Sequence, residues 1–188
     1  MNDTAIRKPD VQDLSTQFAV RPLTSDDVEA VYRLCGGNPL YYRYHPPFVS
    51  RESILEDMSA LPPGKSAADK AYIGFYKQDE LVAVMDLIYD YPEDGVAFIG
   101  FFMMDAARQG TGIGTGIITE CAAALQQNGC RKIRLAIDQG NPQSEAFWTK
   151  NHFAKTGETS PHGDSAYLLM ERQTSGRSAP TEAPAPPP

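Results

Sequence analysis

The chain has 188 residues, which is enough for one sizeable hydrophobic core but few for two domains. Hydrophobic residues make up 41% and charged residues 22%, the balance of an ordinary globular protein, and the net charge is −7. This charge argues against non-specific binding to nucleic acid or anionic lipid, and no stretch approaches the ~20 apolar residues of a transmembrane helix.

The first 17 residues are polar and show no periodicity, so we expect residues 1–17 to form a flexible leader. They lack the apolar core of a signal peptide. The cysteines Cys35, Cys121 and Cys130 are odd in number and fit no metal or disulfide motif. These features predict a cytoplasmic protein without a bound metal.

The middle of the chain alternates between strand and helix periodicity, with Thr24, Ser50 and Asn141 placed as helix N-caps. The pattern predicts the order β-α-α-β-β-β-α-β-α-β, a mixed sheet with helices on its faces. The predicted elements are a strand at 18–21, a helix capped by Thr24, a helix at 50–61, strands at 71–77, 81–89 and 96–104, a helix at 112–127, a strand at 132–138, a helix at 141–151 and a strand at 166–171.

From Gln173 the sequence reads QTSGRSAPTEAPAPPP. Such a segment cannot bury enough apolar surface to offset the entropy of ordering it, so residues 173–188 are predicted to be a disordered, proline-rich tail. A ligand for a partner domain is an alternative role for this tail, which would make the protein an interaction module. One domain then remains, over residues 18–172.

A glycine-rich run between a buried strand and an amphipathic helix carries the clearest functional signal. A helix N-terminus offers free N–H groups and a positive dipole end, and glycine lets a ligand come close, so the run predicts a phosphate or pyrophosphate site. The glycines at 110, 112, 114 and 116 satisfy neither GxxxxGK[ST] nor GxGxxG. They do satisfy Q-x-x-G-x-G, through Gln109, Gly112 and Gly114.

This last pattern resembles motif A of the GNAT superfamily (Gcn5-related N-acetyltransferases), which usually reads [RQ]-x-x-G-x-[GA]. A second segment, at 141–153, resembles the family pattern N-x-x-A-x-x-[FL]-Y-x-K-x-G-F. Asn141, Phe147, Lys150 and Phe153 match it, whereas Ser144, Trp148 and His152 depart from it. The resemblance covers about residues 18–172. It implies a GNAT-like α/β fold (α+β mixed) with a mixed, mostly antiparallel central sheet flanked by helices.

The resemblance also implies a donor site. The pyrophosphate of acetyl-CoA would lie on the N–H groups from Gln109 to Gly114, and the pantetheine arm would run between strands 96–104 and 132–138. An N–H group of the first strand would polarise the thioester carbonyl. The implied cofactor-binding residues are Phe102, Met103, Met104, Gln109, Gly110, Thr111, Gly112, Ile113, Gly114, Thr115, Asn141 and Trp148. Asn141 as a helix cap and Trp148 as a core residue are the structural alternatives.

The implied reaction is direct transfer of an acetyl group to a primary amine in a ternary complex. The acceptor, a small molecule or a peptide amine, is not identified, and a homodimer is common among similar proteins. Trp148 stands where the family often has a tyrosine acid, and an indole cannot serve as that acid. A non-catalytic regulatory module that binds acyl-CoA is therefore the alternative to an active enzyme.

Asp86 is the candidate general base, because it is a lone acid inside the apolar run VAVMDLIY. A carboxylate there is costly unless it is paired or faces a cleft, so a salt bridge or a sheet-edge position is the structural alternative. The aromatic and basic cluster from Tyr41 to His45 lies where the family often builds its acceptor site. It could equally be a surface loop that packs on the core.

Overall fold

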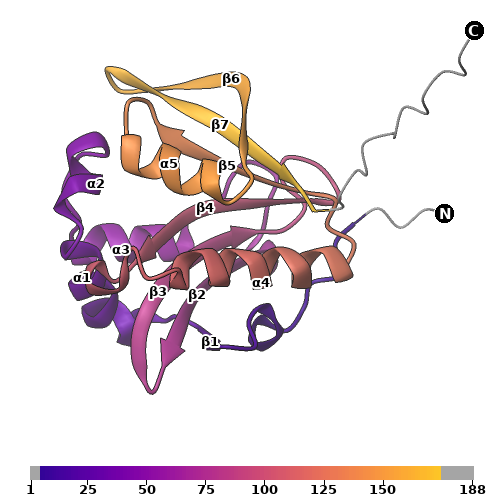
Figure 1. Ribbon diagram of the computed structural model, residues 1–188, viewed down its shortest axis with the longest axis horizontal. Helices are drawn as coiled ribbons and strands as arrows, with labels where there is room; N and C mark the ends of the chain where they lie inside the picture. The colour runs from indigo at the N-terminus through magenta and orange to yellow at the C-terminus, as the bar shows by residue number, and fades with distance from the viewer. Residues whose placement is uncertain (1–4, 175–188) are drawn as a thin grey trace, which may run out of the picture.

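The computed structural model describes residues 5–174, which form a seven-stranded sheet with helices packed on its faces (Figure 1). The strand order is β1-β2-β3-β4-β5-β7-β6, and every neighbouring pair is antiparallel except β4 with β5. The predicted mixed, mostly antiparallel sheet is thus confirmed. The strands are β1 (Ala19–Pro22), β2 (Lys70–Lys77), β3 (Glu80–Ile88), β4 (Val96–Met104), β5 (Lys132–Asp138), β6 (Ala154–His162) and β7 (Ser165–Gln173).

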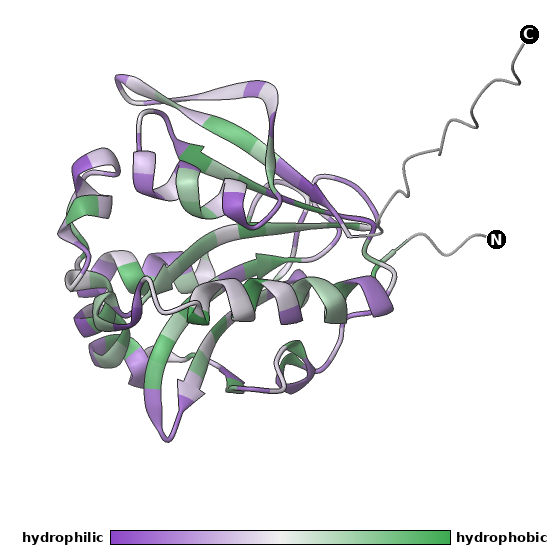
Figure 2. Ribbon diagram, viewed as in Figure 1, coloured by the Kyte–Doolittle hydropathy of each residue, from purple (hydrophilic) through white to green (hydrophobic). Residues whose placement is uncertain are grey.

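Two clusters of buried hydrophobic side chains lie between the sheet and its helices. Figure 2 shows the hydrophobic residues along the strands and helices that contribute to them. The larger cluster joins α4 and α5 to one face of the sheet, and the smaller one joins α1 and α3 to the other face. Successive residues of a strand point to opposite faces, so Tyr72 enters the smaller cluster and Ile73 the larger. The helices are α1 (Val28–Gly36), α2 (Pro39–Tyr44), α3 (Arg51–Ser59), α4 (Ile113–Gln127) and α5 (Pro142–Lys150), with short 3₁₀ turns at Val11–Leu14, Ser25–Asp27, Ala67–Asp69 and Ala106–Arg108.

The predicted caps lie where the helices begin. The Thr24 side chain accepts from the Asp26 N–H and forms a capping box with Asp27, and Ser50 forms another with Ser53. Two elements were not predicted, namely the short helix α2 and the strand β6. β6 lies at one edge of the sheet and its side chains are mostly exposed and polar, so it shows no apolar alternation.

Residues 5–17 are packed against the domain, which corrects the expectation of a flexible leader over 1–17. Ile6 and Leu14 are buried, and the Arg7 N–H donates to the Asn128 main-chain oxygen at 2.9 Å. Both residues join the larger hydrophobic cluster, but they are too far apart in the sequence to show a periodicity. At the other end β7 continues to Gln173, and residues 175–188 of the predicted tail lie outside the described residues. In the described part of the chain, no helix combines the length and the hydrophobicity needed to cross a membrane.

The Glu120 carboxylate of α4 holds the segment at 15–17 in place. It accepts hydrogen bonds from the Ser15 hydroxyl, from the Thr16 N–H and hydroxyl, and from the Gln17 side chain. Burial would raise the pKa of this carboxyl, but the hydrogen bonds from Ser15 and Thr16 hold it below its usual value of 4.5. A lowered pKa means that the folded chain favours the charged carboxylate.

Glu120→Ala is expected to lower the free energy of unfolding by roughly 1–2 kcal/mol, because several donors lose a charged acceptor. The loss should be full above pH 4.5 and should shrink as the pH falls below that value, since protonation removes the same interaction. Urea unfolding at several pH values measures it. Glu29→Ala, which breaks an exposed pair with Arg51, is the control and should change little. An equal effect of both variants would contradict the anchoring role.

Candidate active site

The cleft begins where β4 and β5 part. The two parallel strands pair over four residues that end with Ile99 opposite Leu135, whereas β4 runs on to Met104. On its other edge β4 pairs with β3 from Phe98 to Met104, and Gly100 within this stretch is left out of the register as a bulge. Such a bulge bends the strand and increases its local twist. Main-chain groups of β4 beyond Ile99 therefore face a gap, and backbone N–H and C=O groups need partners there.

A glycine-rich turn joins β4 to α4 beside this gap. Gly110 and Gly112 have φ angles of +74° and +87°, which favour glycine, and the space around both is open. The Gly116 N–H donates to the Gly112 main-chain oxygen at 3.0 Å, so the N–H groups before Gly116 lie at the helix end without helical acceptors. At Gly114 a Cβ would lie 2.5 Å from Sδ of Met104, so this glycine lets α4 pack directly on β4.

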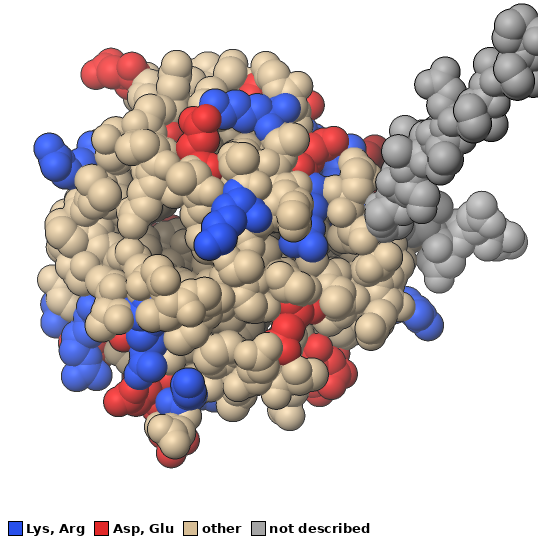
Figure 3. All heavy atoms as spheres, in the orientation of Figure 1, with Lys and Arg blue, Asp and Glu red and all other residues tan. Residues whose placement is uncertain are grey.

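A cleft of about 760 Å³ runs along the gap, and its lining residues come from both faces of the sheet. Its opening is visible as a hollow between α2, α5 and the start of α4 (Figure 3). The predicted donor-binding residues that line it are Phe102, Met103, Met104, Gln109, Gly110, Gly112, Gly114, Thr115 and Trp148. Three others, Thr111, Ile113 and Asn141, lie outside the lining of this cleft.

Side-chain amides hold the glycine-rich turn against its neighbours. Gln109 donates to the Asn38 side-chain oxygen at 2.6 Å and accepts from the Gln143 side chain at 3.1 Å. Asn38 also donates to the main-chain oxygen of Met104 at 3.0 Å, so it ties the turn to the end of β4. Sequence reasoning missed Asn38, because an asparagine before a proline marks only a turn or a helix start.

Asn141 and Trp148 both have the structural roles that were kept as alternatives. The Asn141 side chain accepts from the Ser144 N–H at 3.1 Å and caps α5. Trp148 is buried, and its ring centroid lies 5.0 Å from that of Phe147 and 5.0 Å from that of Phe153. The residue is nevertheless part of the cleft lining. A contact of either residue with the donor stays a prediction.

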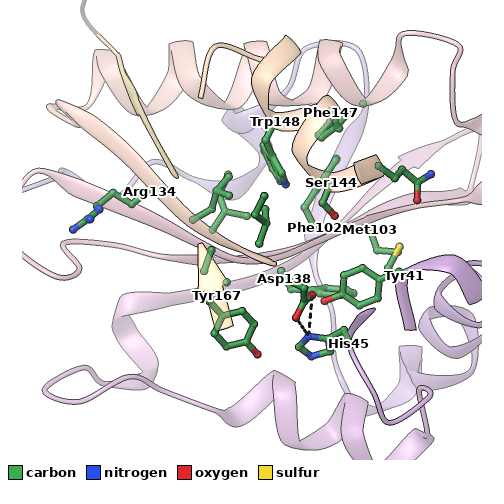
Figure 4. A pocket seen from close by; sticks show the side chains of 18 of the residues that line it. Tyr41, His45, Phe102, Met103, Arg134, Asp138, Ser144, Phe147, Trp148 and Tyr167 are labelled. Carbon is green, nitrogen blue, oxygen red and sulfur yellow. Dashed lines mark hydrogen bonds and ion pairs between the residues drawn. The ribbon is translucent and has the colours of Figure 1, made fainter. Parts of the chain in front are cut away.

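A second group of side chains converges on the opposite side of the strands from Trp148 (Figure 4). His45 follows α2 and Asp138 ends β5, and Nδ1 of His45 lies 3.1 Å from Oδ1 of Asp138. The ring of Tyr41 stacks on His45 with centroids 5.2 Å apart, and Tyr167 of β7 lies opposite Asp138 in the register. Only 6% of the Asp138 side chain is exposed. Burial raises the pKa of Tyr41 and of Tyr167, so both are neutral hydroxyls.

Sequence reasoning found half of this second group. The cluster from Tyr41 to His45 was expected near the acceptor, and both of its end residues line the cleft. Asp138 and Tyr167 were missed, because their proximity to His45 depends on how β5 and β7 pair. Asp138 is the last residue of its strand, a place where binding residues often lie, and this was the signal available.

Asp86, the predicted base, lies beneath the bulge at Gly100. Its Oδ2 accepts from Nζ of Lys70 at 2.9 Å, and that buried ammonium also donates to the main-chain oxygens of Asp57 and Ala60. Burial raises the pKa of the Asp86 carboxyl, against the opposing effect of Lys70. The salt bridge named as an alternative is thus present, and Asp86 is not among the residues that line the cleft. Its role as a base stays a prediction.

Comparison with known protein families gives this geometry a context. Residues 38–153, more than half of the chain, match the model of the acetyltransferase (GNAT) family. The chain belongs to the GNAT family. The matched region includes the amide of Asn38, the glycine-rich turn, the parted strands and α5. No curated protein sequence matches the chain significantly.

Solved structures of acetyltransferases share this GNAT fold at low sequence identity. An acetyltransferase from Thermus thermophilus aligns with a TM-score of 0.68 and 20% identity, covering 84% of this chain and 97% of its own. The PaiA N-acetyltransferase from Thermoplasma acidophilum, solved with coenzyme A, aligns with a TM-score of 0.60 and 17% identity. The alignment covers 83% of this chain and 98% of the other. The ribosomal-protein-S18-alanine N-acetyltransferase from Escherichia coli aligns with a TM-score of 0.60 and 14% identity, and the alignment covers 86% of this chain and 96% of the other.

Gly112→Glu is expected to abolish acetyl-CoA binding while the fold survives, because it places a carboxylate before the free N–H groups of α4. Titration calorimetry with acetyl-CoA measures the affinity. Gly64→Glu is the matched control, because Gly64 also has a positive φ, of +79°, and open surroundings but lies outside the cleft. Unchanged affinity in Gly112→Glu would refute the assignment of this turn to the donor.

Asp86→Asn separates the two roles of that carboxylate. If the ion pair is its role, the variant leaves Lys70 buried without its anion and should lose about 3 kcal/mol of unfolding free energy. Thermal or urea unfolding measures this loss, and Lys70→Met should show a similar one. A variant of unchanged stability that no longer transfers acetyl groups would instead support Asp86 as the base.

Proposed function

We propose that this GNAT protein transfers an acetyl group from acetyl-CoA to a primary amine by direct attack in a ternary complex. One observation carries the proposal: a single cleft connects the free N–H groups at the start of α4 with the buried carboxylate of Asp138 across the gap between β4 and β5. An anionic donor suits the first end, and a cationic acceptor suits the second. The parted strands lie between the two, where the reacting groups would meet.

The donor end fits the shape and the charge of coenzyme A. The N–H groups between Gly110 and Thr115 and the dipole of the 15-residue helix α4 would hold the pyrophosphate. The edge of β4 beyond Ile99 has main-chain groups directed to the gap, with which the amide groups of a pantetheine arm could pair. An N–H group near Phe102 would then lie beside the thioester and would stabilise negative charge on its oxygen.

The acceptor end fits an amine. Asp138 ends β5 with its carboxylate directed into the cleft, and the rings of Tyr41, Phe101 and Tyr167 lie around it. A carboxylate among aromatic rings attracts an ammonium group by charge and by cation–π contacts. Small molecules and peptide N-termini both present such groups.

Trp148 in place of a tyrosine acid does not prevent this reaction. A thiol of ordinary pKa, about 8.5, leaves as a thiolate near neutral pH without being protonated in the same step. The indole packs between Phe147 and Phe153, which gives that side of the cleft an apolar, aromatic wall. A regulatory module that binds acyl-CoA without turnover is the second candidate, and the absence of a phenol at Trp148 is the observation that favours it.

Release of coenzyme A from acetyl-CoA, measured against a panel of amines, tests the proposal. The panel would hold polyamines, amino acids, aminoglycosides and peptides with a free N-terminus. We expect release with at least one class, and we expect Asp138→Asn to raise the KM for that amine about tenfold or more without changing donor affinity. Tight acetyl-CoA binding with no release on any amine would favour the regulatory module.

A further inference from the structure

Two imidazoles and one carboxylate meet beside the acceptor end of the cleft. His45 follows α2, Asp138 ends β5 and His162 ends β6, so three separate elements contribute one side chain each. One nitrogen or oxygen atom of each residue lies within 4.8 Å of those of the other two. The His45 and His162 rings stack with centroids 5.3 Å apart and planes inclined by 12°. The two imidazole edges therefore lie side by side, close to the carboxylate.

One pair of these atoms already has the spacing of neighbouring metal ligands. Zinc–nitrogen and zinc–oxygen bonds are about 2.0–2.2 Å long, which places the ligand atoms of a tetrahedral site roughly 3.3 Å apart. Nδ1 of His45 lies 3.1 Å from Oδ1 of Asp138. By the same geometry, the ligand nitrogen of His162 must move closer to the other two ligand atoms by about 1 Å or somewhat more. His162 is half-buried beside the hairpin turn at Gly163, so rotation of its side chain can supply this movement.

The electrostatic setting favours a cation. Asp138 is almost fully buried, and its ion pairing among the described residues is with His45, not with a lysine or an arginine. A divalent ion would compensate the carboxylate directly, and it would use the lone pairs of two neutral imidazoles. The buried thiols Cys35, Cys121 and Cys130 do not compete for such an ion at the surface.

We propose that His45, Asp138 and His162 form a binding site for a zinc-class divalent ion beside the acceptor end of the cleft. Two nitrogens and one oxygen suit Zn²⁺, whereas Mg²⁺ and Ca²⁺ prefer oxygen ligands alone. Three protein ligands leave a fourth position for water or another small ligand. The ion would connect α2 to the β6–β7 hairpin across the cleft.

Zinc would also control the reaction, and this consequence rests on the proposed function. The ion and the acceptor's ammonium group would compete for the same carboxylate, Asp138, so zinc should inhibit by competition with the amine. Binding of zinc itself does not depend on any activity. Zinc binding and zinc inhibition of acetyl transfer can therefore be tested independently.

The test uses the full chain without an affinity tag, freed of metal by chelation, and titrated with Zn²⁺ alone. We expect saturable binding of one ion with micromolar affinity in calorimetry, a rise in the melting temperature, and the visible absorption of a tetrahedral site with Co²⁺. Mg²⁺ should give neither binding nor stabilisation. His162→Gln and His45→Gln should each weaken zinc binding by at least about tenfold.

The third histidine of the chain provides the matched control. His152 is exposed and has a positive φ of +67°, a conformation that asparagine tolerates, so His152→Asn should fold and bind zinc as the parent does. Loss of binding in His162→Gln and His45→Gln but not in His152→Asn supports the site. No saturable binding to the parent chain, or equal binding by His162→Gln, would overturn it, leaving the stacked histidines as packing alone.

Discussion

β4 and β5 pair over four residues and then separate, and the position of every other part of the site depends on that separation. A strand that loses its neighbour inside a sheet leaves backbone donors and acceptors that need partners. The bulge at Gly100 bends β4 at this point, and a larger residue there would require the Asp86 carboxylate to move, since a Cβ would lie 2.8 Å from it. The buried pair of Asp86 with Lys70 thus supports the bulge from below and links it to the end of α3.

The cleft passes through the gap between β4 and β5 from one face of the sheet to the other, so its two ends have different chemistry. On the face of α4 and α5, a helix N-terminus and aromatic side chains meet the gap, which suits a long anionic molecule with an apolar arm. On the face of α1 and α3, a carboxylate, an imidazole and phenols meet it. Under the proposed function, the donor and the acceptor would occupy opposite ends of this cleft and would not block each other. This separation is what direct transfer between two bound molecules requires.

The glycine-rich turn at the proposed donor end could be located from the sequence because it is local. The glycine-rich turn, the preceding strand and the following helix are continuous in the chain, and each glycine has a spacing that can be compared with known patterns. The side chains at the proposed acceptor end are brought together by non-local contacts. His45 and Asp138 are 93 positions apart, and their contact depends on the path of α2 and on the pairing of β5 with β7. A lone histidine and an aspartate at a strand end carry no shared pattern.

The same distinction between local and non-local contacts explains which parts of the fold could be predicted from the sequence. Caps such as Thr24 and Ser50 are local interactions of a side chain with its own helix, and they were predicted correctly. The edge strand β6 and the packed segment at 5–17 were not, because exposed polar residues and isolated apolar ones gain their structure from neighbours distant in sequence. Asp86 shows the limit of such reasoning: an acid in an apolar strand predicts a partner or a cleft, but not which of the two.

The two outer strands have a consequence for contacts between molecules. At one border of the sheet β1 has only four residues, and at the other β6 pairs irregularly between Lys155 and Thr159 around Gly157, with Pro161 near its end. A short or distorted border strand presents few evenly spaced backbone groups to which a foreign strand could add. If copies of this protein associate, they are therefore expected to meet through side-chain surfaces and not by extending the sheet from one molecule into the next.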